Sequence, residues 1–289
     1  MPFKSVADIA AAYDNGRWHH QRVYRNTNIY CRGLNSMIDY SMSGGTPKYN
    51  AYVGNQLEST AFIGAGNNGI YTGPTPAAGM TKHIAKVAVN TLSTTVPVQH
   101  VFLCDYLMFY PLVDGDSTDL QEMIQADTLP RYSDGAGVKM VLVMTAGAGS
   151  GGSNITIEYT NSDGVTGRIT QVSIGTLNQS GIVACPWSLW GDQVSALSFP
   201  LQGGDRGVRS VQNITFTNGT GVIGAILLFK PLVDIQMLES TTVAEIDLVN
   251  QKLSLPRVYD GAYLNFLATG SAAASTTLPL HAGIDFIWG

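Results

Sequence analysis

The stretch Phe109-Tyr110-Pro111-Leu112-Val113-Asp114 returns 120 residues later as Phe229-Lys230-Pro231-Leu232-Val233-Asp234, with five of six positions identical. A second stretch, Leu129-Pro130-Arg131-Tyr132-Ser133-Asp134-Gly135-Ala136, returns as Leu255-Pro256-Arg257-Val258-Tyr259-Asp260-Gly261-Ala262, with six of eight identical. Both pairs occur in the same order, so this part of the chain is internally duplicated. The period is too long for a solenoid, and it favours two related halves packed with approximate two-fold symmetry.

Around these repeats the sequence reads as short β runs separated by Gly, Asn or Asp turns. Ile155-Thr156-Ile157-Glu158-Tyr159, for example, alternates apolar and polar side chains as a half-buried strand does. Many such runs at short spacing predict an all-β, jelly-roll-like β-sandwich. The predicted strands are Ile84–Asn90, His100–Phe109, Val138–Thr145, Asn154–Tyr159, Gly167–Ile174, Val194–Phe199, Val211–Thr217, Val222–Phe229, Tyr263–Ala268 and Ile284–Trp288.

Residues 1–81 differ from this pattern. Val6–Tyr13 has helical spacing and is followed by an Asn15-Gly16 stop, which predicts one short helix. The rest of the stretch has little periodicity and is rich in Gly, Pro and Tyr, so it cannot easily form its own core. We interpret 1–81 as an extended N-terminal arm, packed either on the body or on a neighbouring subunit. The body, 82–289, is predicted to divide into halves at about 82–200 and 201–289.

The repeated residues have a structural explanation. A proline after a strand ends ladder pairing because it has no N–H, and Asp-Gly supplies the following turn. Arg131 precedes Asp134 by three residues, as Arg257 precedes Asp260, which suggests an ion pair closing each loop. A role in subunit contacts is the alternative for these four residues.

Trp187 and Trp190 form a second candidate, because two indoles stand three residues apart. Buried, they are core aromatics. Exposed, they would anchor a partner or stack on sugar rings.

Motifs for catalysis, cofactors or metals are weak. Gly147–Gly152 matches a dinucleotide-binding glycine pattern, but a strand follows where that site needs a helix. Asp114–Asp119 carries three carboxylates without the glutamate that closes a calcium loop. Cys31, Cys104 and Cys185 are too far apart for a local zinc site. We therefore predict no enzyme activity, no cofactor and no metal.

Charge and hydropathy argue against nucleic acid and membranes as partners. The formal net charge is −5 and the 16 basic residues are scattered, which argues against a nucleic-acid groove. The longest apolar stretches are shorter than a membrane helix of about 20 residues. Asp8 interrupts the apolar residues near the N-terminus, where a signal peptide would need a continuous apolar segment. We therefore expect the protein to fold in the cytoplasm and not to be exported. Only 13% of residues are charged, against about 25% in a typical soluble domain.

Four stretches of the body carry a family resemblance: Leu129–Val138, Asn154–Asn161, Gly203–Val211 and Ile284–Gly289. In these stretches the body resembles tailed-bacteriophage virion structural proteins. The resemblance implies a virion component made in the host cytoplasm, most simply a decoration or cement protein on the head surface. It also implies the major capsid protein as partner and a homo-oligomer, for which a trimer is one arrangement. It brings no catalytic residue.

Two other functions stay open from the sequence. A tail or baseplate adhesin would bind a host glycan, with Trp187 and Trp190 as the stacking platform. A glycan hydrolase would need a carboxylate pair assembled from scattered residues.

Overall fold

The all-β sandwich predicted from the alternating runs is confirmed by a computed structural model. The model describes residues 3–26, 37–64, 69–91, 98–147, 152–174, 182–184, 198–239, 242–251, 254–270 and 279–289. Within these ranges the strands form three antiparallel sheets.

The first sheet, in spatial order, is β14 (Ala244–Asp247), β5 (Lys82–Thr91), β17 (Leu280–Trp288), β1 (Trp18–Asn26) and β3 (Gly44–Thr46), with β15 (Arg257–Val258) also paired to β5. The second sheet is β10 (Arg168–Ile174), β9 (Ser153–Asn161), β12 (Val208–Phe216) and β7 (Gln121–Glu122). The third is β13 (Val222–Gln236), β8 (Lys139–Gly147), β11 (Ile182–Ala184), β2 (Met37–Asp39), β16 (Leu264–Gly270), β6 (Val98–Asp114) and β4 (Thr60–Ala61). Because β13 also pairs with β6, the third sheet closes on itself.

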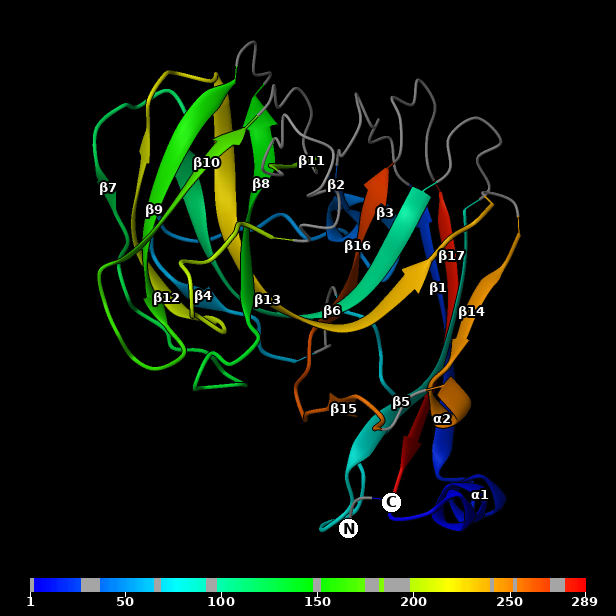
Figure 1. The fold of residues 1–289 in the computed structure, drawn as a ribbon. Coiled ribbons are helices and arrows are strands. Elements are labelled where there is room, and N and C mark those ends of the chain that lie inside the picture. Colours follow the sequence, from blue (N-terminus) through cyan, green and yellow to red (C-terminus); the bar gives the residue numbers. More distant parts are fainter. Residues whose placement is uncertain are drawn as a thin grey trace.

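The long strands β6 and β13 run antiparallel through the centre and reach both sides of the molecule (Figure 1). On one side, β13 pairs with β8, and the sheet of β9 and β12 packs against them. On the other side, β6 pairs with β16, and the sheet of β5 and β17 packs against them. Two β-sandwiches therefore share one central pair of strands.

The duplication appears in this pairing, with strands exchanged between the copies. The first copy supplies β5, β6, β8 and β9, and the second supplies β12, β13, β16 and β17 in the same order. However, β5 pairs with β17 and β9 pairs with β12, so each sandwich takes strands from both copies. The sandwiches consequently do not coincide with 82–200 and 201–289. The strands of the two copies are therefore interleaved, because each copy folds against the other.

The prolines of the repeat do not end their strands as expected. β6 continues past Pro111 to Asp114, and β13 continues past Pro231 to Gln236. In both strands the ladder shifts register beside the proline. A β-bulge is one of the few places where a strand tolerates a residue without an N–H. The repeated Pro-Leu therefore bends two continuous strands.

The arm contributes both helix and strand. The helix expected from Val6 lies at α1 (Val6–Asp14), where Ser5 and Asp8 form a reciprocal capping box. It lies beside the C-terminus of the chain (Figure 1). β1 then pairs with β17 along eight residues. A 3-10 turn at Tyr40–Met42 and the short helix α2 (Leu248–Gln251) complete the described helices.

The second apolar cluster links the arm to the centre. It collects side chains from one face of β6, β8, β13 and β16, and it is completed by Tyr52 and Phe62 of the arm. The ring of Phe62 packs at a tilt against those of Phe109 and Tyr263, with centroids 4.9 and 4.4 Å away. The described part of the arm therefore packs on the chain's own body.

Candidate functional site

Arg131 is the most tightly bound of the residues singled out from the sequence. Its guanidinium donates to both carboxylate oxygens of Asp105 on β6, at 2.9 and 2.8 Å. It also donates to the carbonyl oxygens of Phe62 in the arm and Tyr106. The backbone N–H of Tyr263 gives Asp105 a further hydrogen bond. Arg131 thus joins a loop, a central strand and the arm at one buried point.

The expected ion pair between Arg131 and Asp134 is therefore wrong. Asp134 instead accepts a hydrogen bond from the backbone N–H of Ala136 at 3.0 Å and shapes the Asp-Gly turn. Its own carbonyl accepts from Arg209. The sequence spacing suggested a partner in the same loop, whereas the buried guanidinium of Arg131 pairs with the buried carboxylate of Asp105 on β6.

Arg257 does not repeat the arrangement of its counterpart. It is exposed, and its guanidinium lies 4.4 Å from the ring centroid of Tyr259. The physical reason is a missing partner, since the position 120 residues after Asp105 is Ala225. Asp260 is exposed and acts electrostatically on the buried Lys82 instead. The expected pair of Arg257 with Asp260 is not found among the ion pairs of the described residues.

The two repeated loops nevertheless meet. The rings of Tyr132 and Tyr259, one from each copy, lie edge to face with centroids 5.0 Å apart. Burial raises the pKa of Tyr132, with the nearby Asp105 carboxylate acting in the same direction. The loops of the two copies are therefore in direct contact.

A second buried polar centre, not foreseen from the sequence, surrounds Asp39. Its carboxylate accepts hydrogen bonds from the hydroxyls of Tyr52 and Tyr106 at 2.5 and 2.7 Å, and from the N–H and hydroxyl of Ser41 at 2.8 Å each. Burial raises the pKa of Asp39 despite these donors, and it raises the pKa values of both tyrosines well above normal. The signal in the sequence was a lone carboxylate between Ile38 and Tyr40.

Arg25 extends this centre across the arm. It is fully buried, and its guanidinium donates to the carbonyl oxygens of Ser43, Pro47 and Lys48 and to the side chain of Asn265 on β16. Burial lowers the pKa of Arg25, while the Asp39 carboxylate raises it. Both centres fasten the arm to the body, and neither is open to a substrate.

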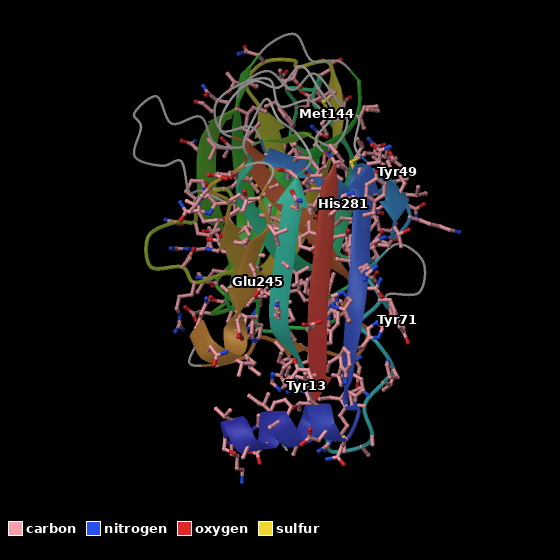
Figure 2. All side chains as sticks on the ribbon, turned by 90° about the vertical axis from the view of Figure 1, so that its right-hand side faces the viewer. Tyr13, Tyr49, Tyr71, Met144, Glu245 and His281 are labelled. Atoms are coloured by element: carbon pink, nitrogen blue, oxygen red, sulfur yellow. The ribbon has the colours of Figure 1, made fainter. Side chains whose placement is uncertain are left out.

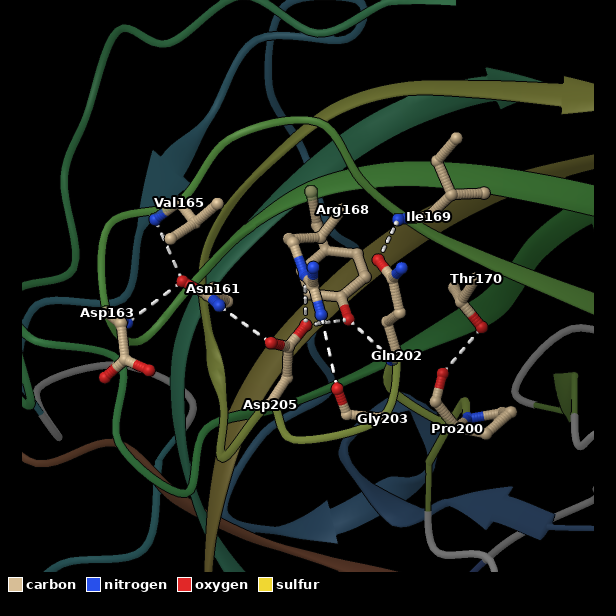
Figure 3. Close-up of polar contacts among 11 residues, drawn as sticks. Asn161, Asp163, Val165, Arg168, Ile169, Thr170, Pro200, Gln202, Gly203 and Asp205 are labelled. Carbon is tan, nitrogen blue, oxygen red and sulfur yellow. Dashed lines mark hydrogen bonds and ion pairs between the residues drawn. The ribbon is translucent and has the colours of Figure 1, made fainter.

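Asp205 organises a third polar centre on the other sandwich (Figure 3). It accepts hydrogen bonds from Tyr159, Asn161 and Arg168 at 2.6, 2.7 and 2.9 Å. The Tyr159 hydroxyl in turn accepts from the backbone N–H of Gln202. Although burial acts to raise it, these hydrogen bonds leave the pKa of Asp205 below its usual value. Two stretches of the sequence resemblance, 154–161 and 203–211, therefore meet in one loop anchor.

The arm also presents apolar side chains to solvent. Val53 and Ile63 are both 80% exposed, and Tyr49 is 47% exposed. They flank a hollow of about 360 Å³ whose lining also includes Phe62, Phe109 and Tyr263. We call Tyr49, Val53 and Ile63 the arm patch.

A larger hollow, of about 610 Å³, opens on the outer face of the first sheet. Figure 2 looks onto this face, with β17 between β5 and β1 and with His281 near the upper end of β17. We call it the sheet-face hollow. Its lining residues are His20, Arg22, Val23, Tyr24, Thr46, Ala88, Val89, Asn90, Val243, His281, Ala282 and Gly283.

The remaining candidates from the sequence have these outcomes. Asp114 and Asp116 accept hydrogen bonds from backbone N–H groups of their own turn and of Gly221. In the described ranges, no group of three or more His, Cys, Asp or Glu side chains could hold a metal ion. No helix in the described part is long and apolar enough to span a membrane. Cys104 is buried as a free thiol, while Cys31, Cys185, Trp187 and Trp190 lie outside the described residues.

Comparisons with known proteins give little beyond this. No family model matches the chain, and no curated protein matches it. It is similar to a structure of infectious bursal disease virus Gt strain, with 10% identity and a TM-score of 0.21 over 94% of this chain and 80% of that one. T=1 particles derived from infectious bursal virus give 9% identity and a TM-score of 0.20, over 93% and 77% of the two chains. The VP2 subviral particle of infectious bursal disease virus gives the same identity and TM-score, over 93% and 80%. At these TM-scores the likenesses carry no argument about this chain.

Proposed function

We propose that this chain is a non-enzymatic virion structural protein of a tailed bacteriophage. In this proposal it decorates the head surface, binds the major capsid protein and cements neighbouring capsomers as a homo-oligomer. The sequence resemblance of the body and the duplicated all-β architecture support a structural component.

The arm patch is the observation that carries the contact role. When a partner covers exposed aliphatic side chains such as Val53 and Ile63, the complex is stabilised by about 25 cal/mol per Å² of apolar surface buried. The patch is also held firmly, because the carbonyl oxygen of the neighbouring Phe62 accepts a hydrogen bond from Arg131 and the Phe62 ring packs in the second apolar cluster. A preorganised apolar patch binds a partner without a large loss of conformational entropy.

The test is binding to heads that lack this chain. Purified protein is mixed with heads assembled from the major capsid protein encoded with it, and bound protein is measured by sedimentation. We expect the wild-type chain to sediment with the heads and to exceed the monomer mass in light scattering. The double variant Val53→Ser/Ile63→Ser should lose binding by at least about tenfold, equivalent to about 1.4 kcal/mol.

The matched control is Val165→Ser, since Val165 is an exposed valine in the turn before β10 on the other sandwich. Its binding should equal that of the wild-type chain. A wild-type chain that stays in the supernatant as a monomer would contradict the proposal. An equal loss of head binding in the control and in the double variant would show that the arm patch is not the contact surface.

A further inference from the structure

The sheet-face hollow arises from the strand register. Gly283 on β17 lies opposite Arg22 on β1 and Ala88 on β5. Residues two apart on a strand point to the same face, so larger side chains stand in the rows on either side. These flanking rows are Tyr24, His281 and Asn90 on one side, and His20, Asp285 and Lys86 on the other. Two small residues thus form a floor between two rows of larger side chains.

The floor is shaped by its glycine. A Cβ added at Gly283 would lie 3.0 Å from Cε1 of His20, so the imidazole leans over this position. His20 is oriented by Asp285, whose carboxylate oxygen lies 2.6 Å from Nδ1. A larger residue here would displace the ring and fill the hollow.

The lining has a charge opposite to that of the whole chain. It includes Arg22 and two histidines but no carboxylate, in a protein of formal net charge −5. The nearby carboxylates Asp285 and Glu245 are already engaged, by His20 and by Lys86. Among the described residues no acidic group pairs with the exposed Arg22. Its planar guanidinium suits a carboxylate, which it can bind through two parallel hydrogen bonds.

The other walls suit a hydroxylated ring. Asn90 has a buried Oδ1 with no hydrogen-bond partner in the described part of the chain, and such an acceptor is costly to leave unpaired. The terminal torsion of an asparagine side chain is broad, so a turn of the Asn90 amide would bring this oxygen to the hollow, where a ligand hydroxyl would donate to it. Tyr24 is 40% exposed and is held edge to face against His281, with centroids 4.6 Å apart. Its ring offers an apolar surface for the C–H face of a sugar.

We propose that the sheet-face hollow binds a carboxylate-bearing sugar, with the carboxylate on Arg22, a ring hydroxyl on Asn90 and the sugar ring against Tyr24. The volume of about 610 Å³ falls within the roughly 300–1,000 Å³ of small-molecule sites. This proposal goes beyond the structural role and does not depend on it. On a virion carrying many copies, weak single sites would add to strong attachment to a surface bearing such sugars.

The experiment is calorimetric titration of the full chain with three sugars: sialyllactose, a glucuronic acid disaccharide and neutral lactose. An open site of this kind should bind a sugar acid with a Kd of about 1 mM. Arg22→Gln removes the charge, and Ala88→Leu fills the floor. Each should weaken binding by at least about tenfold. Arg206→Gln is the control, because Arg206 is an exposed arginine whose ion pair with Asp163 lies on the other sandwich.

Thermal unfolding of each variant checks that the fold is intact. Binding of either acid, lost in both variants and kept in the control, supports the proposal, and the acid that binds identifies the source of the carboxylate. Lactose binding as tightly as the acids, or unchanged binding in both variants, overturns it. An acidic tetrapeptide is titrated in parallel, and its binding in the absence of sugar-acid binding would assign the hollow to a protein partner instead. Absence of all binding also overturns the proposal, while head binding through the arm patch is measured separately.

Discussion

Replacing Arg131 with methionine tests whether the buried ion pair fastens arm and body. Methionine keeps much of the side-chain length but removes four hydrogen bonds, two of them to Asp105. The Asp105 side chain is only 1% exposed and would keep the backbone N–H of Tyr263 as a hydrogen-bond donor. Stranding a buried charge in this way costs about 3–5 kcal/mol. We expect a loss of this size in equilibrium urea unfolding, followed by tryptophan fluorescence.

The loss should depend on pH in a defined direction. Burial raises the pKa of the Asp105 carboxyl, and the hydrogen bond and charge of Arg131 oppose that rise. Without Arg131 the folded-state pKa rises further above the unfolded value, so the folded state binds the proton more tightly than the unfolded chain. The penalty is then full above the folded pKa and shrinks as pH falls toward the unfolded value of about 4. The deficit of Arg131→Met should therefore be smaller at about pH 5 than at about pH 7.

A second variant separates charge from packing. Asp105→Leu/Arg131→Met removes both charges, so it should recover most of the stability lost by the single variant. Two results would refute the reasoning. One is a single variant that loses less than about 1 kcal/mol. The other is a deficit that grows as the pH falls.

Three further predictions concern the other anchors. Arg25→Met should free the arm, because it removes the guanidinium that donates to the carbonyl oxygens of the arm loop and to Asn265 on β16. Limited proteolysis should then cut within residues 1–81 first, and an arm as resistant as in the wild-type chain would show that these hydrogen bonds are dispensable. Asp205→Ala should speed proteolysis of the loop that precedes β12, because it removes the acceptor of three hydrogen bonds. Acid should also loosen this loop in the wild-type chain, because a carboxyl group with a lowered pKa stabilises the fold only while it is ionised, and an unchanged cleavage rate at low pH would contradict this. Gly45→Ala should lower the melting temperature, since its Cβ would lie 2.1 Å from a carbonyl oxygen of β1 at a φ of +123°, whereas Gly44→Ala, whose Cβ has 3.7 Å of clearance, should not.

Local pattern was sufficient for the strands that alternate or are continuously apolar. The expected Ile84–Asn90 lies within β5, and Asn154–Tyr159 lies within β9. These segments present a regular apolar face whatever their partners are. Val194–Phe199 lies mostly outside the described residues, so that prediction is not tested.

Strands whose burial depends on distant partners were missed. β1 reads Trp-His-His-Gln-Arg-Val-Tyr-Arg-Asn, and only Val23 and Arg25 in it are buried. Nothing local marks Arg25 as a core residue, because its burial requires Asn265 and the carbonyl groups of three other residues. Asp39 has the same character. A buried charged side chain is selected by partners far away in sequence, so a window of neighbouring residues cannot identify it.

The position of β1 explains why the arm both completes the fold and forms part of the proposed sugar site. In the pseudo-symmetric pairing, β9 corresponds to β17, and the free edge of β9 is covered by β10, the strand that follows it. The corresponding edge of β17 is covered by β1, from the opposite end of the sequence. An uncovered edge exposes unpaired N–H and C=O groups and invites pairing with other chains, so β1 closes the second sandwich as β10 closes the first. The same strand supplies His20, Arg22 and Tyr24, which means that the sheet-face hollow exists only when the arm is seated.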